Sequence, residues 1–158
     1  SQQRGVSWRR ARFTYSVFFN STPTTDIYAP SLPAAFPVYL AFLKGGFTEA
    51  VSKDVPGIAV VIHANPDFGK GSGKGFTDFL AAMREFLSKY RKPVVCIHGD
   101  SHYYRIDKPF KDESGRTYLH FTRMEVFGSP NVAGVVVSVN PKDPQVFSYR
   151  PYYLNEKN

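Results

Sequence analysis

The sequence predicts an α/β fold, in which a layered β-α-β-α-β unit is followed by an antiparallel β meander. Two observations support this prediction. Up to Asp100, short apolar runs alternate with segments of helical periodicity. After Asp100, strand-like segments are separated by Gly, Pro and Asn turns. Strands that alternate with helices favour parallel pairing, and right-handed crossovers then set consecutive strands side by side.

The first strand and the first helix are predicted for residues 12–19 and 37–54. In the first segment aromatic and aliphatic residues alternate with Thr and Ser, as in a strand. A loop rich in Ser, Thr and Pro follows at residues 20–33. The helix has one apolar face, although Gly45 and Gly46 weaken the helical pattern. The apolar positions of that face are Val38, Phe42, Phe47 and Val51.

Two more strands and a second helix complete the β-α-β-α-β order. Residues 58–62 and 94–97 are continuous apolar runs, as expected for strands that are covered on both faces. A polar, glycine-rich loop at residues 63–75 precedes the helix predicted for 78–89, which Thr77 can cap. The apolar positions of this helix are Phe79, Met83, Phe86 and Tyr90.

The last part of the chain is predicted to be an antiparallel meander. Its strands cover residues 118–127, 133–139 and 146–153. The length of 158 residues suits one domain, so residues 1–158 form a single domain or a part of one.

Composition limits the class of protein. Apolar residues make up 42% and charged residues 21%, as in soluble globular proteins. No apolar run reaches membrane-spanning length, so a membrane partner is not expected. The net charge of +7 suits anionic partners, but the basic residues are dispersed. A solvated basic surface is therefore favoured over a nucleic-acid site. The single cysteine, Cys96, lies in an apolar run and is predicted to be a small buried residue.

Polar side chains follow two of the predicted strands. His63 comes directly after the second strand, and His98, Asp100 and His102 follow the third. In open α/β sheets ligands bind beyond the carboxyl ends of the strands, where these loops would converge. Imidazole and carboxylate groups are suitable ligands for divalent transition metals. The sequence therefore predicts a metal site at this edge, whereas His120, inside a predicted strand, is assigned a structural role.

Two short motifs add a family resemblance. The chain contains two motifs separated by a helix, Val60-Val61-Ile62-His63 and Gly99-Asp100-Ser101-His102. They resemble the last two motifs of the calcineurin-like metallophosphoesterases, a family that includes the purple acid phosphatases. In that family they read Val-x-x-His and Gly-His-x-His. The order, the intervening helix and the following β meander resemble the C-terminal half of the family's β-sandwich. The resemblance spans about residues 12–150.

The resemblance implies a function and a set of ligands. His63 and His102 would bind divalent manganese, iron or zinc ions in a metal-dependent phosphoester hydrolase that acts on a phosphorylated substrate. Asp100 stands where the family has its first histidine, and it could ligate the metal or orient an imidazole. His98, next to the motif, could have a structural role or contact phosphate. Tyr103 and Tyr104 could stack on a substrate ring or pack within the protein.

A competing alignment and a departure from the family qualify this interpretation. Gly99, Asp100 and Tyr103 also match Gly-Asp-x-x-Tyr, an early motif of purple acid phosphatases. This alignment is rejected, because neither a preceding Asp-x-His nor a following Gly-Asn-His-Asp/Glu occurs.

The first three motifs of the family, which supply the bridging aspartate and the catalytic histidine, are missing. The chain alone is therefore expected to be inactive. It would be a fragment, one part of a split enzyme, or a degenerate relative that acts through protein partners. Its expected partners are the missing N-terminal half or another copy of itself.

Overall fold

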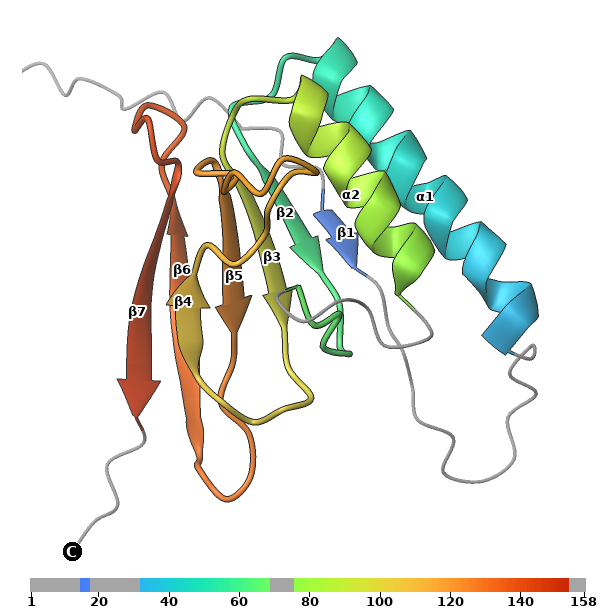
Figure 1. Cartoon of the computed structure of the whole chain (residues 1–158). Helices are drawn as coiled ribbons and strands as arrows, with labels where there is room; N and C mark the ends of the chain where they lie inside the picture. The colour runs from blue at the N-terminus through green and yellow to red at the C-terminus, as the bar shows by residue number, and fades with distance from the viewer. Residues whose placement is uncertain (1–14, 18–31, 69–75, 154–158) are drawn as a thin grey trace, which may run out of the picture.

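The fold was analysed in a computed structural model, which describes residues 15–17, 32–68 and 76–153 (Figure 1). The described residues form a mixed α/β fold with a five-stranded sheet, two helices and a separate two-stranded sheet. The elements in chain order are β1 (Tyr15–Val17), α1 (Leu32–Ser52), β2 (Ile58–Val61), α2 (Thr77–Lys89), β3 (Val94–His98), β4 (Arg105–Asp107), β5 (Phe121–Glu125), β6 (Ala133–Val139) and β7 (Phe147–Tyr153).

The first three strands lie side by side and parallel, as predicted. The sheet has the order β1-β2-β3-β5-β4, and β2 pairs with both β1 and β3. Residues 58–61 and 94–98 form β2 and β3, close to the predicted runs. Of the first predicted strand only residues 15–17 are described, and the rest of it lies outside the described residues, as do residues 69–75.

The predicted antiparallel meander is wrong for its first strand. β5 pairs in parallel with β3, and the short strand β4, which the sequence did not predict, pairs antiparallel with β5 at the sheet edge. Hydrophobic alternation identifies a strand but not its direction. The direction of β5 follows from the chain's path, because β4 runs back along the sheet and the segment at residues 108–120 then returns the chain to enter β5.

The last two strands form the predicted antiparallel hairpin. β6 and β7 pair over their full lengths, with Val136 opposite Arg150. A Cβ added to Gly57 would lie 3.0 Å from the side chains of Val146 and Phe147, so the hairpin packs closely at the start of β2. The ring of Phe127 meets that of Tyr153 at a centroid distance of 5.6 Å. The helices and the hairpin lie on opposite sides of the sheet in Figure 1, giving three layers.

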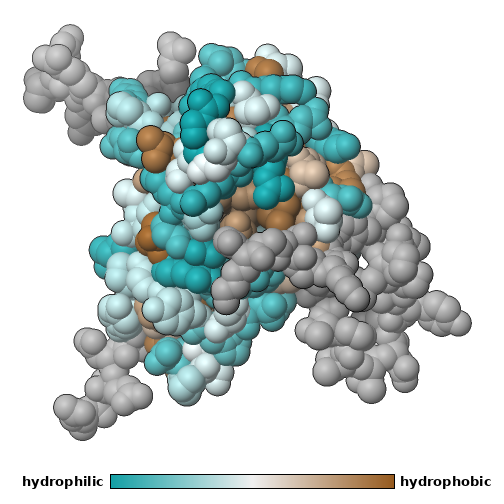
Figure 2. Space-filling view, in the orientation of Figure 1, coloured by the Kyte–Doolittle hydropathy of each residue, from teal (hydrophilic) through white to brown (hydrophobic). Residues whose placement is uncertain are grey.

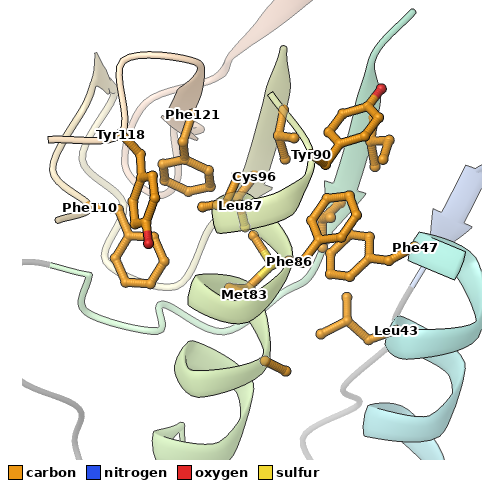
Figure 3. Close-up of a cluster of buried hydrophobic side chains, with 14 of the residues drawn as sticks. Leu43, Phe47, Met83, Phe86, Leu87, Tyr90, Cys96, Phe110, Tyr118 and Phe121 are labelled. Carbon is orange, nitrogen blue, oxygen red and sulfur yellow. The ribbon is translucent and has the colours of Figure 1, made fainter. Parts of the chain in front are cut away.

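The main core lies between the helices and the sheet (Figure 3). The rings of Phe47 from α1 and Phe86 from α2 stack with centroids 3.6 Å apart and planes within 6°. Helix α1 begins at residue 32, five residues before the predicted start, and it continues through Gly45, which is exposed. Burial of its core-facing side chains outweighs the low helix propensity of glycine. Those side chains are Leu43, Phe47 and Ala50.

The outer surface combines polar side chains with separate apolar ones. On the face shown in Figure 2, the described surface is mainly hydrophilic and its hydrophobic residues form small separate spots. Exposed large apolar side chains include Val51 on α1, Leu119 before β5 and Tyr152 on β7. Among the described helices, none has the length and apolar character needed to cross a membrane.

Leu87 tests the contribution of this core to stability. Its side chain is fully buried in α2, so Leu87→Ala should lower the free energy of unfolding by about 2–5 kcal/mol, as measured by urea denaturation. The matched control is Leu119→Ala, which removes the same atoms from a residue that is 74% exposed and should change stability by less than about 0.5 kcal/mol. Equal effects of the two substitutions would contradict the location of the core.

Candidate functional site

The loops that carry the predicted ligands emerge at one edge of the sheet. β2, β3 and β5 are parallel, so their carboxyl ends lie together, at the lower end of the strands in Figure 1. His63 lies in the loop after β2, and Asp100 and His102 lie in the loop after β3. The backbone N–H of Gly99 donates to the carbonyl oxygen of His63 at 3.0 Å. The structure therefore brings the two motif loops into direct contact.

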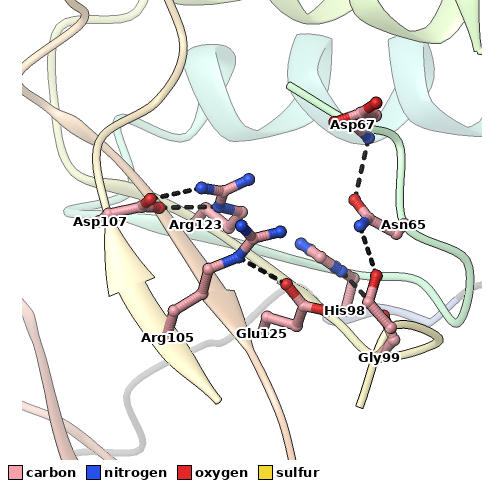
Figure 4. Close-up of polar contacts among 9 residues, drawn as sticks. Asn65, Asp67, His98, Gly99, Arg105, Asp107, Arg123 and Glu125 are labelled. Atoms are coloured by element: carbon pink, nitrogen blue, oxygen red, sulfur yellow. Dashed lines mark hydrogen bonds and ion pairs between the residues drawn. The ribbon is translucent and has the colours of Figure 1, made fainter. Parts of the chain in front are cut away.

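A side-chain contact joins the same two loops. Asn65 Nδ2 donates to Ser101 Oγ at 2.6 Å, and Asn65 Oδ1 accepts from the backbone N–H of Asp67 at 2.9 Å (Figure 4). Asn65 therefore fixes the course of its own loop and attaches it to the loop after β3. The sequence analysis assigned no role to this residue, although its position two residues after His63 is a usable signal.

The loop after β5 orients His102. The Nδ1 atom of His102 lies 3.0 Å from the carbonyl oxygen of Ser129, and since a carbonyl only accepts, Nδ1 carries the proton. A neutral ring then has its lone pair on Nε2. Metal-binding histidines have this arrangement, in which a backbone carbonyl holds the non-ligating nitrogen. The ring also lies against Gly128, where a Cβ would collide with it.

The backbone of the loop after β3 is unusual. Asp100 has φ of 76° and His102 has φ of 57°, both in the left-handed region that non-glycine residues seldom adopt. Such conformations persist only where the surrounding structure enforces them, and they are frequent at functional sites. The side chains of Asp100, His102 and His63 are all exposed.

The predicted ligands share an edge but do not form a complete metal site. Within residues 15–17, 32–68 and 76–153, no group of three or more His, Cys, Asp and Glu side chains lies close enough together to hold a metal ion. The donor types and the orientation of His102 fit a divalent metal, whereas the number of converging ligands does not. His63, Asp100 and His102 therefore remain predicted ligands.

Beside this edge lies a row of paired charged side chains, of which the two on β5 are buried, that the sequence analysis largely missed (Figure 4). Glu125 is 0% and Arg123 5% exposed. Arg105 Nε donates to Glu125 Oε2 at 2.6 Å, and Arg123 forms a two-contact ion pair with Asp107. Each pair joins β4 to β5 across the antiparallel register. The sequence did contain a signal for this pairing, because each of the two strands carries a basic and an acidic residue spaced two positions apart.

His98 belongs with the buried side chains of this row rather than with the exposed loop. It is 1% exposed and sits beside Glu125 in the β3–β5 register, with its ring 6.2 Å from that of Phe68. Its Nδ1 lies 3.1 Å from the carbonyl oxygen of Gly99. Burial lowers the pKa of His98, opposed in part by the bond to Gly99 and the charge of Glu125. The expected phosphate contact would require this ring to become accessible.

Other predicted residues have ordinary structural contacts. Tyr104 stacks on Phe127 with centroids 4.3 Å apart, so it packs within the protein, whereas Tyr103 is 64% exposed. His120 Nε2 lies 3.1 Å from the carbonyl oxygen of Leu87, which agrees with the structural role assigned to it. Cys96 is fully buried, as predicted, and burial raises the pKa of its thiol.

Comparison with known proteins does not assign a family. No family model matches the chain, and no curated protein is significantly similar to it. The resemblance to the metallophosphoesterases therefore stays a prediction that depends on the two motifs and their position at the sheet edge.

The contact between Gly128 and His102 can be tested by substitution. Gly128→Ala should displace the imidazole from Ser129, because the new methyl group would overlap the ring. The expected result is a change in the ring ¹⁵N shifts of His102 at neutral pH, measured by NMR, that indicates mixed tautomers. Gly134→Ala is the control, since nothing lies within 4 Å of its Cβ position. Unchanged His102 signals in Gly128→Ala would contradict the contact.

Because two histidines are buried, we expect the protein to lose stability at mildly acidic pH. Burial lowers the pKa of both His98 and His120 below the ordinary value of 6.5. Below about pH 6.5 the unfolded chain then binds protons that the folded chain resists, so the free energy of unfolding falls between pH 7 and pH 5. His120→Gln should reduce this fall, as measured by urea denaturation at the two pH values.

Asp112→Asn is the matched control for this measurement. A hydrogen bond from Ser114 is the main cause that lowers the pKa of Asp112 from 3.8 to about 2. The stability that this carboxylate contributes is fully present above about pH 3.8 and is lost only below it. Asp112→Asn should therefore leave the difference between pH 7 and pH 5 unchanged. If the free energy of unfolding of His120→Gln falls between pH 7 and pH 5 as much as that of the original chain, His120 does not contribute to the pH dependence.

Proposed function

We propose that this chain is the C-terminal part of a metal-dependent phosphoester hydrolase of the calcineurin-like metallophosphoesterase type. The observation that carries the proposal is the contact between the two motif loops. His63 and His102 belong to loops that follow neighbouring parallel strands, and the Gly99 N–H bond to the His63 carbonyl joins those loops. Such an edge is where α/β proteins bind their ligands.

The chemistry of the side chains supports a divalent metal. Imidazole nitrogen and carboxylate oxygen suit manganese, iron and zinc. The bond from His102 Nδ1 to Ser129 keeps Nε2 available as a ligand, and the exposed carboxylate of Asp100 lies two residues away. When bound, a metal pair in this class polarises the phosphoryl oxygen and lowers the pKa of bound water. In this proposal His63, Asp100 and His102 of this chain supply some of the metal ligands.

The remaining ligands must come from elsewhere. Two metal ions need more ligands than His63, Asp100 and His102 provide. We propose that the N-terminal half of the domain, or another chain, supplies them. The second candidate function is a degenerate protein of the same fold that acts through protein partners. The aspartate at position 100, where the family has histidine, favours it.

Metal titration of the purified full chain tests the proposal. Zn²⁺ or Mn²⁺ should bind, and His63→Gln and His102→Gln should each weaken binding by at least about tenfold in calorimetry, because each removes a ligand. His120→Gln is the control and should bind as the original chain does, since His120 contacts Leu87 away from the loops. If neither His63→Gln nor His102→Gln changes binding, the proposal fails.

A phosphodiesterase assay of the same preparations separates the two candidate functions. We expect negligible turnover by the chain alone. Turnover that returns when an N-terminal half is added would support the split hydrolase. Metal binding without any restored turnover would favour the degenerate relative.

A further inference from the structure

The loop that carries Asp100 and His102 passes over the end of another strand. β5 lies between β3 and β4 in the sheet, so the chain leaves β3 at His98, passes the carboxyl end of β5 and enters β4 at Arg105 (Figure 1). The loop at residues 99–104 therefore has its two ends on opposite sides of β5.

Both ends of this loop lie beside the same side chain. Glu125, the last residue of β5, is the register partner of His98 in the parallel pair and of Arg105 in the antiparallel pair. Its Oε2 accepts the hydrogen bond from Arg105 Nε at 2.6 Å. The backbone carbonyl of His98 accepts the N–H of Val126 at 2.9 Å, which fixes the other end.

Burial makes the pairing with Arg105 obligatory. The carboxyl group of Glu125 has no exposure to solvent, and a buried charge is costly unless it is paired. Among the described residues, Glu125 Oε1 and His98 Nε2 are buried without a hydrogen-bond partner, so the bond from Arg105 to Glu125 Oε2 is the contact that compensates this charge. The Arg105 side chain itself is 31% exposed.

We propose that Glu125 is a positioning residue, which holds the Arg105 end of the loop at residues 99–104 and so presents Asp100 and His102 at the sheet edge. The left-handed backbone of Asp100 and His102 supports this assignment, because a loop with one end released could relax to commoner conformations. The assignment to metal binding rests on the proposed function, but the holding of the loop does not.

The neighbouring ion pair provides a matched control. Asp107 and Arg123 join the same two strands on the same face, two residues farther from the loop along each strand. Asp107→Asn thus removes an ion pair of the same kind and leaves Glu125 and Arg105 in place.

The experiment compares Arg105→Gln, Glu125→Gln and Asp107→Asn in the full chain without added metal. Hydrogen exchange by NMR follows the amide of Gly99, which bonds to His63, and the ring ¹⁵N signals of His102 follow its bond to Ser129. Arg105→Gln should speed exchange at Gly99 by at least about tenfold and shift the His102 signals. Asp107→Asn should leave both unchanged. If Glu125→Gln fails to fold, Arg105→Gln still decides, because its side chain is partly exposed.

The outcomes separate this proposal from the proposed function. Unchanged Gly99 exchange and His102 signals in Arg105→Gln would overturn the positioning role, whether or not the chain binds metal. An equal rise in exchange at Cys96, in the middle of β3, would also overturn it, because the pair would then be a general stabiliser. A loop that loosens as expected in a chain that binds neither Zn²⁺ nor Mn²⁺ would support the positioning role and reject the hydrolase.

Discussion

The fold depends on the burial of the central parallel strands on both faces. β2, β3 and β5 have neighbours on both sides in the sheet, and their inward-facing residues need cover above and below. The helices provide it on one face, where Val94, Cys96 and Phe121 join the aromatic core. The hairpin β6–β7 lies over the other face, where Val95 of β3 and Met124 of β5 are buried. The parallel pairing of these buried strands places their carboxyl ends at one edge and therefore determines which loops can meet at the candidate site.

The candidate site follows from the way the loops are joined at that edge. The bond from Gly99 to His63 continues the β2–β3 ladder one step beyond the strands, so the first loop contact is an extension of the sheet. The contact of His102 with Gly128 and Ser129 comes from the third loop. The exposed polar residues are therefore attached to three strands by hydrogen bonds between their loops, and the Arg105–Glu125 ion pair joins β4 to β5 at the end of the loop at residues 99–104.

Residue patterns predicted those parts of the fold in which burial leaves a clear signature. The continuous apolar runs that became β2 and β3, and the helical spacing of α2, are such cases. β4 was missed because it has three residues, two of them charged. Arg123 and Glu125 are charged side chains that are usually exposed, so their burial follows from partners on β4 that pattern alone does not reveal. The strand-end rule placed His63 and His102 at one edge, but it did not identify Ser129, because the strand before Ser129 was predicted to belong to an antiparallel meander.

The position of β5 between β3 and β4 determines where residues can be inserted into the chain. The connection at residues 99–104 must span one strand width and meet fixed residues at both ends, so an insertion there would disturb its geometry. The turn at residues 140–145 is exposed throughout and lies at the opposite end of the molecule (Figure 1). Added residues there would project into solvent. The turn is therefore the natural place to attach a fluorophore or an affinity tag without disturbing the loops at the other end.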